Sequence, residues 1–344
     1  MMRDSNISHP FYIKPILMER VWGGNRLGTL FGNLIPDGRV IGESWELSDR
    51  PEAQSIVLGG PFDGKTVRYL LENHSEALLG PELAAVKPSR FPLLAKFVDA
   101  GSALSIQVHP DDIGARSFND RGKAECWVVV HAEQGARLTR GLLPGTTRSD
   151  FEKAVAYDRV ADMLHSFTPS VGDVIALPPG VVHAIGAGIV VAEIQQNSDT
   201  TLRIYDYNRL GLDGKPRQLH VLAALSAIRF GDLGNEFSGD MTADIVVPLE
   251  CVKNNDVTVE LLLKGRFFDL KRYTIRAGEN YLLQPEPNVP RLLMTISGSG
   301  VLAGRELKAG QTVLIPAKAP ALTIKAVDHA NLVLLTSCPT LAAC

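Results

Sequence analysis

The sequence predicts a mainly β protein, a barrel or jelly roll in two units with a few short helices. Three observations predict this class. Many short apolar segments alternate with turns that use 31 glycines and 21 prolines. Only a few segments show a helical period instead. The length of 344 residues suffices for about two domains with separate cores. Numerous short strands separated by such turns are typical of sandwiches and barrels.

The elements follow in chain order from their periodicity. Residues 1–60 are predicted to form extended segments separated by turns. Helices are predicted over 66–80, over 150–167 with Asp150 as the N-cap, and over 217–230, where apolar residues recur at helical spacing. The remaining strands are predicted within residues 91–100, 103–110, 125–132, 173–178, 189–196, 201–207, 267–275, 291–298, 310–317 and 331–337.

A domain boundary is predicted at GDLGNEFSGDMT, residues 231–242, because this stretch is rich in glycine and polar residues. We therefore expect one unit over 1–230 and a second over 231–344. An internal similarity supports the division, since GDVIALPPGVVHAI from residue 172 and GQTVLIPAKAPALTI from residue 310 share a glycine, an apolar strand and a proline. The position of His183 is Ala321 in the second copy. The second unit is thus expected to be a degenerate copy without metal chemistry, and convergent strand-turn sequence is the alternative reading.

Composition excludes several classes of function. The formal net charge is −3 and no basic block stands out, which argues against a nucleic-acid partner. No stretch approaches the roughly 20 apolar residues of a membrane span, and the first residues lack the apolar core of a signal peptide, so we expect a cytoplasmic protein. The four cysteines are far apart without CxxC pairing, which predicts reduced, mostly buried thiols. Nucleotide-binding glycine motifs are absent from the sequence.

His183 is a candidate metal ligand because of its surroundings. Taken alone, a histidine is more often structural than a ligand. The order Gly172, Pro178, Gly180, His183 matches the second cupin motif at every fixed position except the last, where Ala187 replaces asparagine. In that motif the turn directs the imidazole into a barrel.

A second group of candidate ligands lies in SIQVHPDD, residues 105–112. Side chains two apart on a strand share a face, so Gln107 and His109 can point inward while Ile106 and Val108 point outward. The alternative is a solvent-exposed polar face. Glu125 opens the next apolar strand, where an unpaired carboxylate is costly unless it binds a cation.

Together these residues predict a metal site made of Gln107, His109, Glu125 and His183. Two histidines and a glutamate form a known catalytic zinc set, which leaves a position open for water or substrate. We expect one zinc ion per chain, although iron, manganese or cobalt can use the same ligands.

Several sequence blocks around this set resemble type I mannose-6-phosphate isomerases, particularly the shorter bacterial form. The resemblance covers about residues 11–230, and the C-terminal hundred residues match only in general character. Beyond the metal set, the blocks are VWGGNRL at 21, GESWELS at 42, PLLAKFVDA at 92, LSIQVHPDD at 104, GKAECW at 122, PPGVVHAIG at 178 and EIQQNSDTTLRIYDYNR at 193.

The resemblance implies a zinc-dependent cupin enzyme that interconverts D-mannose 6-phosphate and D-fructose 6-phosphate through an enediol. It implies that Arg203 is the active-site arginine, although this residue can instead pair with an aspartate to hold its loop. Lys123 matches the lysine of a His-Lys-Pro-Glu motif in longer members, where this chain has Gly122 in place of the histidine. The residues linked by the resemblance to the sugar phosphate are Lys96, Ser105 and Arg209, and the alternative for Lys96 is an edge residue reaching solvent.

Proton transfer between C2 and C1 of the sugar requires a base within hydrogen-bond range. The sequence offers Lys123 and Glu193, with a zinc-bound water as a third candidate, and either side chain can instead be an orienting group. Two other functions stay open at this point. One is a non-catalytic cupin that binds metal or sugar, and the other is an iron dioxygenase, to which Gln107 is less suited. The only partner we expect is a small sugar phosphate, without an obligate protein partner.

Overall fold

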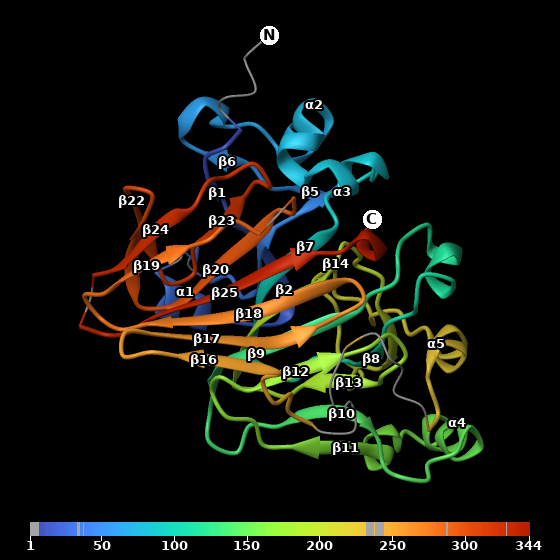
Figure 1. The fold of residues 1–344 in the computed structure, drawn as a ribbon. Coiled ribbons are helices and arrows are strands. Elements are labelled where there is room, and N and C mark those ends of the chain that lie inside the picture. Colours follow the sequence, from blue (N-terminus) through green and yellow to red (C-terminus); the bar gives the residue numbers. More distant parts are fainter. Residues whose placement is uncertain are drawn as a thin grey trace.

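Four antiparallel β-sheets stack face to face, and helices cover the outer face of the five-stranded sheet at one end of the stack (Figure 1). This computed structural model describes residues 7–32, 35–36, 38–231, 237, 244–286, 288–327 and 329–344. Along the stack, a five-stranded sheet faces a six-stranded sheet, which packs on an eight-stranded sheet, which in turn faces a four-stranded sheet. The prediction of a mainly β protein with few helices is confirmed.

The first two sheets come from the N-terminal part of the chain. The five-stranded sheet has the order β11 (Leu164–Phe167), β10 (Leu138–Leu142), β13 (His183–Ile185), β8 (Ile106–Val108) and β15 (Leu202–Tyr205). The six-stranded sheet has the order β12 (Val174–Leu177), β9 (Glu125–Ala132), β14 (Ile189–Gln196), β7 (Leu93–Ala100), β3 (Ile41–Leu47) and β2 (Ile16–Gly24).

The other two sheets come mainly from the C-terminal part. The eight-stranded sheet has the order β16 (Glu250–Lys253), β17 (Val257–Lys264), β18 (Phe268–Ile275), β25 (Leu332–Pro339), β20 (Arg291–Ser297), β23 (Thr312–Ile315), β1 (Phe11–Ile13) and β6 (Val57–Leu58). The four-stranded sheet has the order β19 (Asn280–Leu283), β24 (Leu322–Ala326), β21 (Ser299–Leu302) and β22 (Arg305–Lys308). A small ribbon pairs β4 (Asp49–Arg50) with β5 (Ala53–Gln54).

The six-stranded sheet is buried on both faces. One face, including Phe97 and Ile194, packs against the eight-stranded sheet, where Met294 belongs to the same core. The other face, including Val98 and Val191, packs toward the five-stranded sheet. Burying each large apolar side chain contributes about 1.5–3 kcal/mol. The six-stranded sheet therefore lies in the interior of the protein. Its face toward the five-stranded sheet, called the inner face below, is where polar groups can be enclosed.

The predicted helix over 66–80 is confirmed as α2 (Val67–Leu79), which Thr66 caps by accepting from the amide of Tyr69. The other helices begin and end as follows: α1 (Arg26–Phe31), α3 (Pro81–Ala85), α4 (Arg148–Ala156), α5 (Val221–Ala227), and the 3₁₀ turns η2 (Gly60–Phe62), η3 (Gly114–Phe118), η4 (Val160–Met163) and η5 (Leu341–Ala343).

The helix predicted over 150–167 is wrong beyond Ala156. Thr147, not Asp150, is the N-cap of α4, and Asp150 completes a capping box three residues later. The helix ends before Asp158, which has a φ of 55°, and the following residues form η4 and then β11. Pairing of β11 with β10 overrides the local helical pattern. The third predicted helix, over 217–230, is shortened to α5.

The predicted division at residue 230 stays a prediction, since most of 231–242 lies outside the described residues. The eight-stranded sheet also includes strands from the start of the chain. Strand β1 pairs with β23 through Tyr12 and Val313, and β6 pairs with β1, so the start of the chain completes the eight-stranded sheet. Among the described residues, no helix combines the length and apolar character needed to cross a bilayer.

Glu46 is a carboxyl group buried in the body of the protein. It lies on β3 with 0% exposure, accepts a hydrogen bond from the Ser44 hydroxyl at 2.5 Å, and has no partner for its second oxygen among the described residues. Burial raises the pKa of Glu46 to about 8. The folded protein therefore holds this proton at pH values where the unfolded chain releases it.

We expect Glu46→Gln to flatten the pH dependence of stability. Between the usual glutamate pKa and about 8, only the unfolded state ionises, so the wild-type free energy of unfolding should fall as pH rises. The fall is at most about 1.4 kcal/mol per pH unit. Urea unfolding from pH 5 to 8 should show that the free energy of unfolding of the variant, relative to that of the wild type, increases with pH. Glu72→Gln, at an exposed site, is the control, and a difference independent of pH would contradict the expectation.

Candidate metal centre and active-site cleft

Two rows of cross-strand neighbours face each other between the five- and six-stranded sheets. On the six-stranded sheet, Lys96 of β7 pairs with Glu193 of β14, which pairs with Trp127 of β9. Directly paired residues point to the same face of a sheet. The row thus places a cation and a carboxylate on the inner face, and the Trp127 indole donates to Glu193 at 2.9 Å.

The opposite row lies on the five-stranded sheet, where His183 pairs with Gln107 and Gln107 pairs with Arg203. Ile106 and Val108 belong to the separate core formed with α4 and α5. Gln107 and Arg203 both line the cleft between the sheets. Alternation along β8 therefore separates its polar residue from its apolar ones.

The histidines and the glutamate of the predicted metal set converge in this space. The distance from His109 Nε2 to Glu125 Oε2 is 3.5 Å, and that from His183 Nε2 to Glu125 Oε1 is 3.4 Å. One ligand atom from each residue lies within 4.8 Å of the other two. Ligands about 2.0–2.2 Å from one tetrahedral ion stand roughly 3.4 Å apart, so the two distances to Glu125 are those expected of residues that share one divalent ion.

Both imidazoles are oriented as metal ligands. Nδ1 of His109 lies 2.9 Å from the Thr200 carbonyl, and Nδ1 of His183 lies 2.9 Å from the Val181 carbonyl. Because these ring nitrogens donate to carbonyls, each Nε2 carries a lone pair, and that of His109 lies 3.2 Å from the Lys123 ammonium. Burial lowers the pKa of His183 to about 4 and that of His109 well below its usual value, which keeps both rings neutral. Neutral rings are the form that binds metal.

Glu125 supplies the carboxylate of this set. Both of its oxygens are buried, and Oε1 has no hydrogen-bond donor among the described residues. The Lys123 ammonium lies 2.9 Å from Oε2 as an ion-pair partner. The lysine compensates Oε2, and a cation between the three side chains would compensate Oε1 as well. The residues present therefore fit a divalent metal.

Gln107 lies next to this set, with its amide nitrogen and not its amide oxygen toward His183. Its Nε2 is 3.4 Å from His183 Nε2, and its Oε1 accepts from the Ser105 hydroxyl at 3.0 Å. The two ends of an amide are nearly isosteric. A 180° turn would present Oε1 to the metal position, with Nε2 donating to Ser105. Gln107 as a metal ligand stays a prediction that requires this orientation.

The loops that carry the two histidines are fastened to each other. The amide of Gly180 donates to the carbonyl of His109 at 2.8 Å. Gly180 has a φ of 87°, and a Cβ there would lie 2.8 Å from the Ala227 carbonyl oxygen, so the turn requires glycine. A Cβ at Gly122 would lie 2.6 Å from the amide nitrogen of Asp112. The loop geometry thus favours glycine at position 122.

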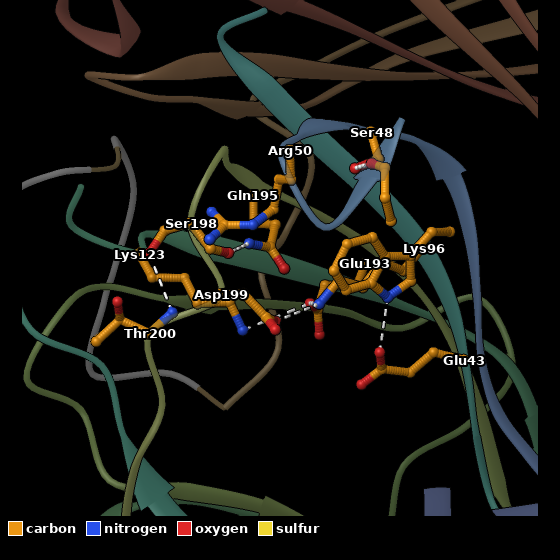
Figure 2. Close-up of polar contacts among 12 residues, drawn as sticks. Glu43, Ser48, Arg50, Lys96, Lys123, Glu193, Gln195, Ser198, Asp199 and Thr200 are labelled. Atoms are coloured by element: carbon orange, nitrogen blue, oxygen red, sulfur yellow. Dashed lines mark hydrogen bonds and ion pairs between the residues drawn. The ribbon is translucent and has the colours of Figure 1, made fainter. Parts of the chain in front are cut away.

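A cleft of about 350 Å³ lies next to this cluster, and Gln107 and Lys123 line it. Its charged lining residues are the cations Arg20, Lys96, Lys123, Arg203 and Arg217 and the acids Glu43, Glu193 and Asp199. Figure 2 shows Glu193 and Asp199 between the ammonium groups of the two lysines. Each lysine Nζ lies 3.7 Å from Glu193 Oε1, and Lys96 Nζ lies 3.4 Å from Asp199 Oδ1.

The buried charges influence one another's protonation. Burial, followed by the charge of Glu125, raises the pKa of Glu193. Burial alone would lower the pKa of Lys123, but the carboxylates of Glu125, Glu193 and Asp199 raise it overall, so this lysine is a cation. Lys96 is 2% exposed and lies over the Trp45 ring, so it does not reach solvent.

Arg209 does not line this cleft. Its guanidinium donates to Asp206 at 2.7 Å and to Ser102 at 3.0 Å. Asp206 also accepts from Arg217, at 3.1 Å, and it is Arg217 that reaches the cleft. Among the predicted phosphate residues, Ser105 contacts Gln107 and Lys96 lines the cleft. These assignments to phosphate stay predictions.

Four charged residues of the cleft are missing from the predicted site residues: Arg20, Glu43, Asp199 and Arg217. Glu43 stands two residues before Trp45 in GESWELS, so strand alternation could have placed it on the same face. It accepts from Arg20 at 2.8 Å and from the Trp45 indole at 2.7 Å. Arg217 is not predicted as a site residue because the sequence predicts a helix over 217–230. In fact α5 begins only at Val221, and Arg217 lies in the preceding loop.

Known proteins match both the sequence and this fold. A family model described as the catalytic domain of type I phosphomannose isomerase matches residues 11–121. A mannose-6-phosphate isomerase of Bacillus subtilis is 32% identical over 315 residues, covering 90% of this chain and 93% of the relative. The chain belongs to the type I phosphomannose isomerase family.

Other phosphomannose isomerases extend the match. A mannose-6-phosphate isomerase of Streptococcus mutans is 31% identical, again covering 90% of this chain and 93% of the relative. The crystal structure of a mannose 6-phosphate isomerase from Bacillus subtilis gives a TM-score of 0.83 at 30% identity, covering 95% of this chain and 99% of that one. The resemblance predicted from the motif blocks is confirmed, and it includes most of the C-terminal hundred residues.

Removing one imidazole should abolish metal binding. We expect His183→Ala, purified and dialysed against zinc, to retain almost none of the roughly one equivalent expected for the wild type, because one histidine and one glutamate make a weak site. Elemental analysis measures the metal, and circular dichroism confirms the fold. His131→Ala, at the other end of β9 from Glu125, is the control. A full equivalent of zinc in His183→Ala would show that the ligand set is wrong.

Proposed function

We propose that this chain is a zinc-dependent isomerase that interconverts D-mannose 6-phosphate and D-fructose 6-phosphate through an enediol intermediate. The observation that carries the proposal is the buried cluster of His109, Glu125 and His183 at one side of a cleft with more cations than carboxylates. Family membership supports the same reaction, because the relatives are named for it.

The charge of the cleft suits a sugar phosphate. Arg203 has its Nε buried without a partner among the described residues, which leaves a donor available. Arg217 has its pKa lowered by burial and then by the charge of Arg203, so the two guanidiniums repel each other. A phosphate dianion between such groups would offset this repulsion and accept forked hydrogen bonds. We assign the phosphate to this arginine pair.

The chain's own groups account for the proton transfer. A bound zinc ion would polarise a substrate oxygen and stabilise negative charge that develops there. We assign the role of base to Glu193, whose pKa is raised by burial and whose carboxylate accepts from the Trp127 indole, and which would take the proton from C2 and return it at C1. Lys123, held as a cation by its acidic neighbours, balances charge beside it.

A coupled assay tests the reaction directly. The purified protein should produce fructose 6-phosphate from mannose 6-phosphate, lose activity after exhaustive chelation, and recover it when zinc is restored. The loss is expected because metal sites of this kind stabilise charge that side chains alone do not. No turnover in the zinc-restored sample would refute the isomerase, and turnover unaffected by complete metal removal would refute the metal-dependent mechanism.

The arginine assignment predicts a difference between two neighbouring residues. Arg217→Gln should raise the KM for mannose 6-phosphate at least about tenfold, the equivalent of about 1.4 kcal/mol, because a charged hydrogen bond to phosphate is lost. Arg209→Gln is the matched control, since it shares Asp206 but points away from the cleft. Steady-state kinetics of the two variants decide the question. A larger KM effect in Arg209→Gln would restore that residue as the phosphate ligand.

A further inference from the structure

We infer that Asp120 is a positioning residue of this active site, which holds the 198–200 loop so that Thr200 orients His109 and Asp199 pairs with Lys96. The inference deepens the proposed function and rests on it. Asp120 lines neither the metal cluster nor the cleft. Its action is therefore indirect, through the loop.

The loop occupies a decisive place in the fold. It follows β14 of the six-stranded sheet, which ends at Gln196, and precedes β15 of the five-stranded sheet, which begins at Leu202. It thus connects the two sheets that carry the opposed rows of the site. Residues 197–201 belong to no strand, and beyond the bond from the Asn197 amide to the Pro92 carbonyl the loop is held largely by side chains.

One carboxylate oxygen of Asp120 serves this loop. Oδ2 accepts from the Asp199 amide at 3.2 Å and from the Thr200 hydroxyl at 3.1 Å. The Ser198 hydroxyl donates to the Arg121 carbonyl at 2.8 Å, lies 3.4 Å from the same Oδ2, and accepts from the Thr200 amide at 3.3 Å. Two consecutive residues, Asp199 and Thr200, are therefore held by a single oxygen atom, and Ser198 is held beside it.

The rest of the Asp120 carboxylate is tied to the body of the protein. Oδ1 accepts from the Arg121 amide at 3.0 Å, Arg50 at 3.3 Å and Arg90 at 3.4 Å. Arg50 also donates to Oδ2 at 3.1 Å and to the Asn197 carbonyl at 3.3 Å. Figure 2 shows Arg50 beside Ser198, above the lysines and Glu193. Burial would raise the pKa of Asp120, but the hydrogen bond and charge of Arg50 lower it, so the anchor is ionised.

The loop transmits this anchoring to two functional groups. The Thr200 carbonyl takes the Nδ1 hydrogen of His109 at 2.9 Å and so fixes which nitrogen faces the metal. Asp199 Oδ1 lies 3.4 Å from the Lys96 ammonium, which also neighbours Glu193. Losing a group that orients a metal-bound histidine typically costs 10–100-fold in metal affinity or activity. A shift of the loop would move both contacts together.

The test substitutes the anchor and measures zinc binding apart from catalysis. Asp120→Asn keeps the shape but replaces one acceptor oxygen with a donor and removes the charge. Titration of metal-free protein with zinc against a chromophoric chelator should show dissociation constants about tenfold higher than in the wild type, and kcat for mannose 6-phosphate should fall by about tenfold or more. Asp49→Asn is the matched control, since Asp49 is buried and bonds Arg68 and the Phe91 amide, outside the loop. It should lower the unfolding midpoint without changing zinc affinity.

A second pair of variants covers the case in which Asp120→Asn does not fold. Thr200→Val removes the hydroxyl that donates to Asp120, whereas Thr200→Ser keeps it. Zinc affinity and kcat should fall in the valine variant and be restored in the serine variant. Wild-type values in folded Asp120→Asn, or equal values in the two Thr200 variants, would overturn the inference. If the wild type binds zinc but does not convert mannose 6-phosphate, the proposed function fails, and the zinc titrations still decide the role of Asp120.

Discussion

The burial of ionised groups between two sheets is the constraint on which the rest of the structure depends. Glu125, Lys123, Lys96 and Glu193 are each at most 5% exposed. An uncompensated buried charge costs several kcal/mol, so each of these residues must lie beside a group of opposite sign. The strand register achieves this by placing Lys96 opposite Glu193. A slip of one residue would turn these charges toward the apolar core that contains Phe97.

Strand positions and much of the metal set follow from local sequence patterns. The apolar runs that became β7, β9, β14 and β25 have the length and β-branched content of buried strands, and their neighbours in sequence contain clear turn residues. His183 follows a glycine-proline turn, and His109 lies two residues after Gln107, so short-range geometry could place both. The segment 150–167 could not be read this way, because the choice between helix and strand there is made by β10, an element distant in sequence.

The remaining parts of the site depend on contacts that no local pattern encodes. Arg217 enters the cleft because Asp206 fixes it, and Arg209 is drawn away by the same carboxylate and by Ser102. Nothing in the local sequence distinguishes the two arginines. They differ in whether the fold directs the side chain toward the cleft, as for Arg217, or not, as for Arg209. Single residues in the sequence indicate the chemistry available to the site, whereas the position of each cation depends on the packed structure.

The pairing of β1 and β6 with the C-terminal sheet has a consequence for how the polypeptide is made. Strand β23, which receives β1, leaves the ribosome roughly three hundred residues after it, so the earliest strands must wait for nearly the last before the eight-stranded sheet can close. Such distant pairing slows folding and leaves strand edges unprotected meanwhile. The edge of β1 that will receive β23 therefore stays without its partner during most of synthesis.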